Sequence, residues 1–183
     1  MLEFSERVAS EEFAQMARHP DLPNACTRSR KLPLPALVGA PLSMRNQSRQ
    51  AMLNGFFASV CATHALTRVV SDRAFAQARD RLHLPALVAL NDRVVARADS
   101  AGLIPRGCGL RLVAADASLL MPATRGCLLS RSAAQRDQRL FALYLPGAEL
   151  TLHASVHSRL VAERRLLVEA LDVLGPDDVL VLD

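Results

Sequence analysis

The stretch that decides the fold is residues 158–183, which read SRLVAERRLLVEALDVLGPDDVLVLD. Apolar residues recur at helical spacing over Ser158–Leu174, and the Gly-Pro pair that begins at Gly175 stops the predicted helix. The apolar run Val179–Asp183 predicts a buried strand that ends on an acid. A helix of this length between strands is a crossover connection, so the last strand is predicted to lie parallel to an earlier one.

The earlier strands are predicted from short apolar runs bounded by turn residues. They are Leu110–Ala115, a second strand that begins over Ser118–Met121 and ends near Pro122, and the pair Arg139–Leu145 and Glu149–Val156, joined by a Pro146-Gly147 turn. The order of elements predicts an α+β protein: a helical region, three antiparallel-like strands, a helix and a parallel strand.

Two acids follow the strands that this topology would bring together. If the last strand pairs with Leu110–Ala115, then Asp116 and Asp183 lie near neighbouring carboxyl-side strand ends. Two carboxylates at such a position can hold a divalent metal for phosphoryl transfer, because Mg²⁺ prefers oxygen ligands. An Asp after a strand is also a common turn former or helix cap, and the spacing alone leaves both interpretations open.

The first part of the chain has helical periodicity with turn punctuation. The predicted helices are Ser10–Arg18, a helix that opens at Pro33 and Pro35 and is kinked or ended by Pro41, then Ser48–Val60, Asp72–Leu82 and one from Pro85 to about Ala98. Ser71 is the predicted N-cap of the helix that begins at Asp72.

The charge distribution points to a polyanionic partner. No acidic residue occurs between Leu22 and Ser71, while six basic residues do, and a stretch of one sign favours phosphate contacts. A solvated basic face without a partner is the alternative. The candidate DNA-binding residues are Arg28, Arg30, Lys31, Arg45, Arg49, Arg73 and Arg79.

The composition narrows the protein class further. No run of about 18 apolar residues is present, and the first residues are unlike a signal peptide, so a cytoplasmic protein with no membrane partner is expected. Four widely spaced cysteines predict reduced, mostly buried thiols instead of a disulfide framework or zinc site.

Four segments of the sequence resemble DDE-type transposases of the insertion-sequence-four family. Gly109–Pro122 resembles the block around the first catalytic Asp, and Leu174–Asp183 resembles the strand that ends in the second. Ala25–Pro33 is similar to the common Phe-Thr-Arg-Lys-Arg-Lys-Leu-Pro opening, and Val70–Arg79 to the family's Ser-x-x-Ala-Phe-x-x-Ala-Arg helix. The four segments occur in the order of the family.

The resemblance implies a helical DNA-binding region over residues 1–101 and the first part of an RNase H-like catalytic domain over 102–183. In the family two Asp and one distant Glu bind Mg²⁺ (or Mn²⁺), which activates water or a DNA 3′-hydroxyl for attack at phosphorus. Asp116 and Asp183 match the two Asp positions, which implies catalytic and metal-binding roles for both. DNA bearing terminal inverted repeats is the implied partner, a homodimer is left open, and the DNA-bound protein would lie at the bacterial nucleoid.

The sequence also departs from the family pattern. Ala117 stands where the family has Gly, and Pro41 interrupts a stretch that is normally a continuous helix. The sequence has no segment like the family's Tyr, Arg, Glu and Lys signature, so a truncated transposase that is inactive alone is expected. Two other interpretations stay open: a non-enzymatic DNA-binding regulator and a small metal-dependent nuclease.

Overall fold

The computed structural model describes residues 2–22, 31–43, 48–61, 69–120 and 137–182. The chain divides into two compact units, Met1–Ala89 and Leu90–Asp183, and the division falls inside one helix, α6. Within the described residues, no helix is long and apolar enough to cross a lipid bilayer.

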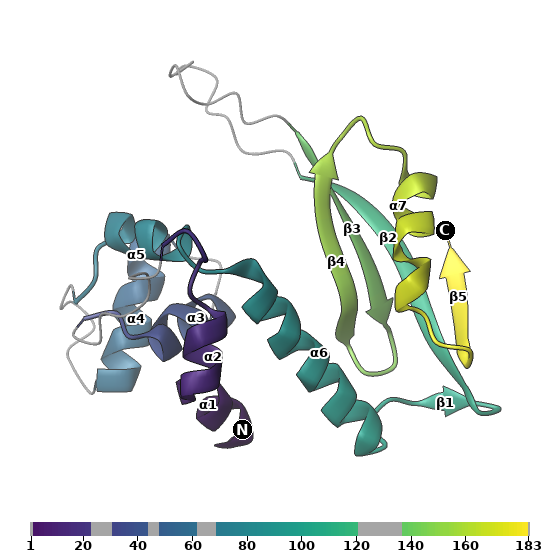
Figure 1. Ribbon diagram of the computed structural model, residues 1–183, viewed down its shortest axis with the longest axis horizontal. Coiled ribbons are helices and arrows are strands. Elements are labelled where there is room, and N and C mark those ends of the chain that lie inside the picture. The colour runs from purple at the N-terminus through teal and green to yellow at the C-terminus, as the bar shows by residue number, and fades with distance from the viewer. Residues whose placement is uncertain (1, 23–30, 44–47, 62–68, 121–136, 183) are drawn as a thin grey trace. The chain divides into compact units, whose positions relative to one another are not determined.

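The first unit is built from helices (Figure 1). Their bounds are α1 Leu2–Ala9, α2 Glu11–Met16, α3 Leu34–Leu42, α4 Arg49–Cys61, α5 Asp72–Arg79 and the start of α6 Leu84–Ser100. Helix α3 contacts α1, α4 and α5, and its buried Leu37 belongs to an apolar interior that also includes Phe13, Leu53 and Phe75.

Local sequence signals set the starts of α2 and α5 and the end of α3. The hydroxyl groups of Ser10 and Ser71 accept hydrogen bonds from the third backbone N–H that follows each, and so cap α2 and α5 as N-caps do. Helix α3 ends at Leu42, one residue after Pro41, which confirms the predicted effect of that proline.

Helix α5 is shorter than the predicted Asp72–Leu82. It ends at Arg79, and the N–H groups of Arg81 and Leu82 then donate to the carbonyls three residues before them, as in a turn. Beyond this turn Leu82 forms a β-bridge with Arg18, and the His83 N–H donates to the carbonyl of Ala17.

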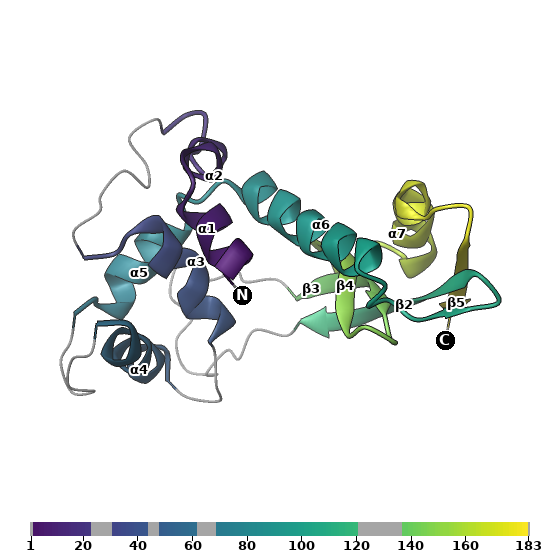
Figure 2. The same cartoon turned by 90° about the horizontal axis from the view of Figure 1, so that it is seen from below.

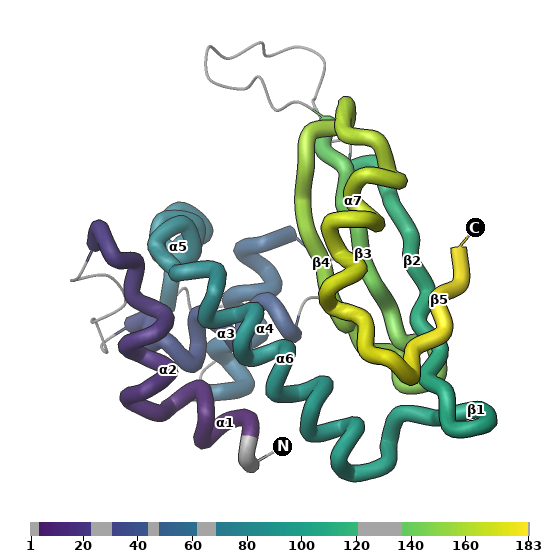
Figure 3. The backbone as a smooth tube through the Cα atoms, turned by 45° about the vertical axis from the view of Figure 1, so that its right-hand side comes forward, coloured from purple at the N-terminus to yellow at the C-terminus, as the bar shows by residue number. Residues whose placement is uncertain are grey.

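The second unit is a mixed sheet with helices on one face (Figure 2). The strands are β1 Arg106–Gly107, β2 Leu110–Leu120, β3 Gln138–Leu145, β4 Leu150–Ser158 and β5 Asp178–Leu182. Strands β1 to β4 are antiparallel in chain order, whereas β5 lies along the other side of β2 and runs parallel to it (Figure 3). The α+β fold class and the parallel last strand are therefore confirmed.

The connection between β4 and β5 differs from the predicted helix Ser158–Leu174. Ser158 still belongs to β4, where it pairs with Gln138, and α7 spans only Glu163–Ala170 before one 3₁₀ turn, Leu171–Val173. Strand pairing to β3 therefore overrides the helical pattern at the start of the segment.

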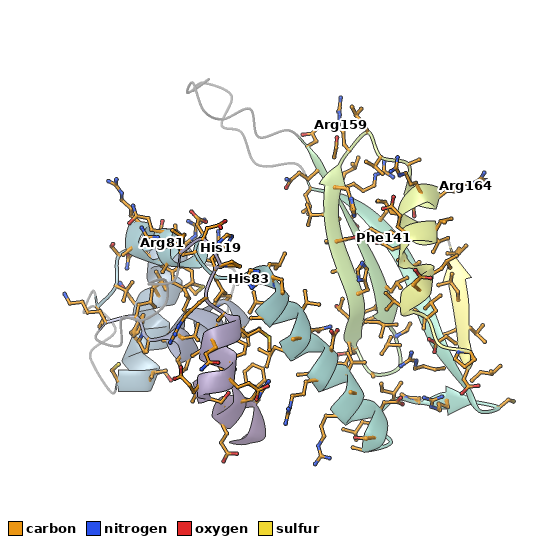
Figure 4. The ribbon with its side chains drawn as sticks, viewed as in Figure 1. His19, Arg81, His83, Phe141, Arg159 and Arg164 are labelled. Carbon is orange, nitrogen blue, oxygen red and sulfur yellow. The ribbon has the colours of Figure 1, made fainter. Side chains whose placement is uncertain are left out.

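The core of this unit lies between the sheet and α7. Phe141 of β3 is 1% exposed and belongs to one cluster with Val113, Leu143 and the α7 residues Leu166 and Ala170 (Figure 4). The later part of α6 contributes Val95 to the same cluster, so both helices cover the same face of the sheet.

Candidate functional site

Asp116 lies in the middle of β2, not behind the end of a strand. The predicted break between Leu110–Ala115 and Ser118–Met121 is wrong, because Ala114–Leu120 forms a continuous antiparallel ladder with Gln138–Tyr144. The ladder holds Asp116 in extended backbone opposite Ala142, although Asp has a low preference for strands.

The carboxylate of Asp116 is exposed on the sheet face opposite the core. Neighbouring strand residues alternate between faces, and Ala115 is buried in the core cluster on the other side. The Ser118 hydroxyl, two residues along the same face, donates to Oδ2 of Asp116 at 3.1 Å. This hydrogen bond restrains the carboxylate and leaves most of its lone pairs free for a ligand.

The parallel pairing of β2 and β5 brings the two acidic segments together in register. Leu112 pairs with Val179, Ala114 with Val181, and Ala115 with Leu182. In the sequence Asp116 follows Ala115 and Asp183 follows Leu182. Asp183 itself lies outside the described residues.

An ion pair that the sequence analysis missed joins the beginnings of these two strands. Arg111 Nε donates to Asp178 Oδ1 at 2.6 Å, and a terminal guanidinium nitrogen donates to Oδ2 at 2.7 Å. The Asp178 side chain is 3% exposed and that of Arg111 is 12% exposed. Opposite charges at the starts of two strands already predicted to be parallel were the signal that could have revealed this pair.

The surroundings of Asp178 stabilise its charged form. The hydrogen bond from Arg111 lowers the pKa of Asp178, and the backbone N–H of Gly175, which donates at 2.8 Å, acts in the same direction. Burial opposes this by favouring the neutral acid, but the net effect is a pKa below the ordinary aspartate value.

A second ion pair connects this cluster to the end of α6. Arg106 donates to both carboxylate oxygens of Asp99, at 2.9 and 3.1 Å. One Asp99 oxygen also lies 4.0 Å from a guanidinium nitrogen of Arg111. The four side chains, two basic and two acidic, tie α6, β1, β2 and β5 together where β2 begins.

The face that carries Asp116 is also rich in apolar side chains. Within the described strands, its exposed large apolar residues are Leu110, Leu112, Leu120, Tyr144, Val156, Val179 and Val181. This face therefore combines one carboxylate with a wide apolar surface.

The described candidate DNA-binding residues all lie in the first unit. Lys31, Arg73 and Arg79 are exposed, and Arg49 forms an ion pair with Asp72 at 3.1 Å that offsets its charge. Arg28, Arg30 and Arg45 lie outside the described residues. In the second unit Arg164 of α7 also extends into solvent (Figure 4).

Among the described residues, Asp116 is the candidate ligand for a metal ion. Its exposed carboxylate supplies the hard oxygen ligands that Mg²⁺ and Mn²⁺ prefer. Among the described residues, no group of three or more His, Cys, Asp or Glu side chains is arranged to hold a metal. Asp116 can therefore act as one ligand of such an ion, but the described residues do not supply a complete set of ligands.

No family model, curated protein or solved structure matches the chain. A functional assignment therefore depends on the residues and the topology described above.

Proposed function

We propose that the chain carries the helical DNA-binding region and the first catalytic elements of a DDE-type DNA transposase. The observation that carries the proposal is the register of β2 and β5, in which Ala115 pairs with Leu182. Each of these residues directly precedes an acid that matches a catalytic Asp of the family, Asp116 and Asp183.

The topology of the second unit supports an RNase H-like core. That core requires three antiparallel strands, a helix on one face, and a further strand parallel to the first. Here β2, β3 and β4 are antiparallel in chain order, α7 packs on the sheet, and β5 is parallel to β2. The order across the sheet is β4-β3-β2-β5.

In this proposal Asp116 and Asp183 hold Mg²⁺ or Mn²⁺. A bound ion of this kind polarises phosphoryl oxygens and lowers the pKa of a coordinated water. Ser118 contributes by orienting the Asp116 carboxylate, to which it donates a hydrogen bond. The intact transposase would bind terminal inverted repeats and catalyse strand cleavage and transfer.

The first unit would supply the contacts to DNA. Lys31, Arg73 and Arg79 are exposed cations, and such side chains displace condensed counterions when they reach backbone phosphates. We propose that these elements bind DNA and metal, and that cleavage also requires a third acidic ligand of the kind that the family provides.

The test is a Mn²⁺ titration of the isotope-labelled chain followed by NMR. Selective paramagnetic broadening of the amides next to Asp116 is expected, and Asp116→Asn should weaken Mn²⁺ binding by on the order of tenfold or more. Asp172→Asn, which removes an exposed carboxylate from the 3₁₀ turn, is the matched control and should bind as the wild type does.

The same titration, together with assays of DNA binding and DNA cleavage, separates the alternatives. DNA binding that is unaffected by EDTA, combined with no broadening near Asp116, would favour the non-enzymatic DNA-binding regulator. Metal-dependent cleavage of DNA by this chain, abolished by Asp116→Asn, would favour the small nuclease.

A further inference from the structure

The apolar pattern of β5 does not by itself define how this strand is aligned with β2. Val and Leu alternate over Val179–Leu182. A slip by one residue would exchange the two faces of the strand, but a slip by two would again set Val on the open face and Leu on the core face. Some other interaction must therefore select one alignment.

The Arg111–Asp178 ion pair distinguishes between these alignments. Its two parallel hydrogen bonds, at 2.6 and 2.7 Å, join residues that are register partners at the start of the pairing. A side-on guanidinium–carboxylate pair has a fixed geometry, so it tolerates little displacement along the strand. The Arg111 N–H also donates to the carbonyl of Asp177 at 2.8 Å, which anchors the same point through the backbone.

A slip by two residues would remove this pairing in either direction. In one direction Asp178 would lie opposite Val113, which is 0% exposed, and the carboxylate would be buried without its cation. In the other direction Leu180 would lie opposite Arg111, and the guanidinium would lose both acceptors. Burying an unpaired charge is strongly unfavourable, so both slipped alignments are disfavoured.

The turn before β5 reinforces the same alignment. The N–H of Gly175 donates to Oδ2 of Asp178 at 2.8 Å, so this carboxylate joins the end of the crossover connection to β2. Asp99 lies 4.0 Å from Arg111 and is itself paired with Arg106, which helps to hold the guanidinium group in place.

We propose that Arg111 and Asp178 are positioning residues that set the register of β5 on β2. Through that register they align Ala115 with Leu182, the residues that precede Asp116 and Asp183 in the sequence. The role of the two residues in aligning β5 is inferred from the observed contacts alone. The consequence of that alignment for metal binding rests on the proposed function.

The experiment compares Arg111→Lys and Asp178→Asn with the wild type by NMR. Arg111→Lys keeps the charge but cannot form two parallel hydrogen bonds, and Asp178→Asn keeps the shape but loses the charge. The readouts are the cross-strand nuclear Overhauser contacts between β2 and β5 and the amide hydrogen exchange of Val179–Leu182.

We expect contacts that match Leu112–Val179 and Ala114–Val181 in the wild type. In both variants we expect additional contacts displaced by two residues, and β5 amides that exchange on the order of tenfold faster, while β3 and β4 keep their protection. Arg165→Lys is the matched control, because Arg165 pairs with Glu169 on the exposed surface of α7. It should leave β5 unchanged.

Two results would overturn the inference. One is an unchanged register and unchanged β5 exchange in both variants. The other is an equal loss of protection in β3 and β4, because the pair would then hold the whole unit together without selecting an alignment.

The Mn²⁺ titration separates this inference from the proposed function. Absence of Mn²⁺ binding to the wild type, together with a displaced β5 in the variants, would reject the metal site and retain the positioning role. Binding by the wild type that weakens in Arg111→Lys in parallel with the loss of register supports both.

Discussion

The guanidinium group of Arg111 donates two hydrogen bonds to the carboxylate of Asp178, which lies 67 residues further along the chain. This contact joins the beginning of β2 to the beginning of β5. Because the Asp178 side chain is 3% exposed, the energy of the contact is screened by solvent much less than that of a surface ion pair.

The first prediction concerns acid stability. Hydrogen bonding to Arg111 lowers the pKa of Asp178 in the folded protein below its value in the unfolded chain. The resulting stabilisation is fully present above the unfolded pKa, roughly 3.9, and is lost as the pH falls through the lower folded pKa. Chemical denaturation at several pH values should therefore show a decrease in the free energy of unfolding below about pH 4.

Asp178→Asn tests the origin of that decrease. The variant should be less stable near neutral pH and should lose part of the acid dependence, because Asn does not titrate. Asp172→Asn, at an exposed position, serves as the control. An acid dependence identical in Asp178→Asn and the wild type would show that other carboxylates cause the decrease.

The second prediction concerns the core beneath α7. Phe141 is 1% exposed and belongs to the cluster that includes Leu143 and Leu166. Phe141→Ala should lower the free energy of unfolding by about 3–5 kcal/mol, because a cavity replaces the ring. Denaturant unfolding followed by the amide signals of β3 is the measurement. Val168→Ala, at an exposed position on α7, should lower the free energy of unfolding much less. An equal decrease in both variants would mean that Phe141 is not a core residue.

The third prediction tests the cap of α5. The Ser71 hydroxyl accepts a hydrogen bond from the Ala74 N–H at 3.2 Å. Ser71→Ala should therefore cost about 1 kcal/mol of stability, measured by thermal or denaturant unfolding. Ser71→Asp should restore most of that loss, since Asp is also a good N-cap and its charge favours a helix N-terminus. Equal stability of the Ala and Asp variants would contradict the capping role.

The fourth prediction concerns DNA affinity. If exposed cations of the first unit contact phosphates, then Arg73→Ala combined with Arg79→Ala should weaken binding to duplex DNA at low salt. The slope of log affinity against log salt should become shallower by up to about two, since each lost phosphate contact removes roughly 0.9. Fluorescence anisotropy over a range of salt concentrations provides both quantities.

The control for this prediction keeps the change in net charge the same. Arg164→Ala combined with Arg165→Ala removes two exposed cations from α7 of the second unit. Affinity and salt slope close to those of the wild type are expected for this variant. Equal decreases in DNA affinity for the two double variants would indicate a general effect of net charge. The first unit would then have no specific DNA-binding surface.

Much of the architecture was predictable because it depends on short-range signals. The Ser71 cap, the end of α3 after Pro41, and the hairpin turn at Pro146 each depend on a few neighbouring residues. The parallel direction of β5 was also predictable, since a helical crossover allows few alternatives.

Other features depend on contacts between distant residues and were not predictable. The sequence around Asp116 favoured a strand end, yet β2 continues past it because β3 supplies a partner for every residue as far as Leu120. Likewise the segment after Ser158 had a helical pattern, but pairing with Gln138 holds its first residue in β4.

The sequence by itself determined the types of the elements, their approximate order and the two acids that follow apolar runs. Those properties follow from side-chain periodicity and turn chemistry, which act over a few residues. Only the tertiary structure decided that Asp116 lies within a strand and that Arg111 meets Asp178. The physical reason is that strand continuity and register depend on hydrogen bonds and buried charge pairs between segments far apart in the chain.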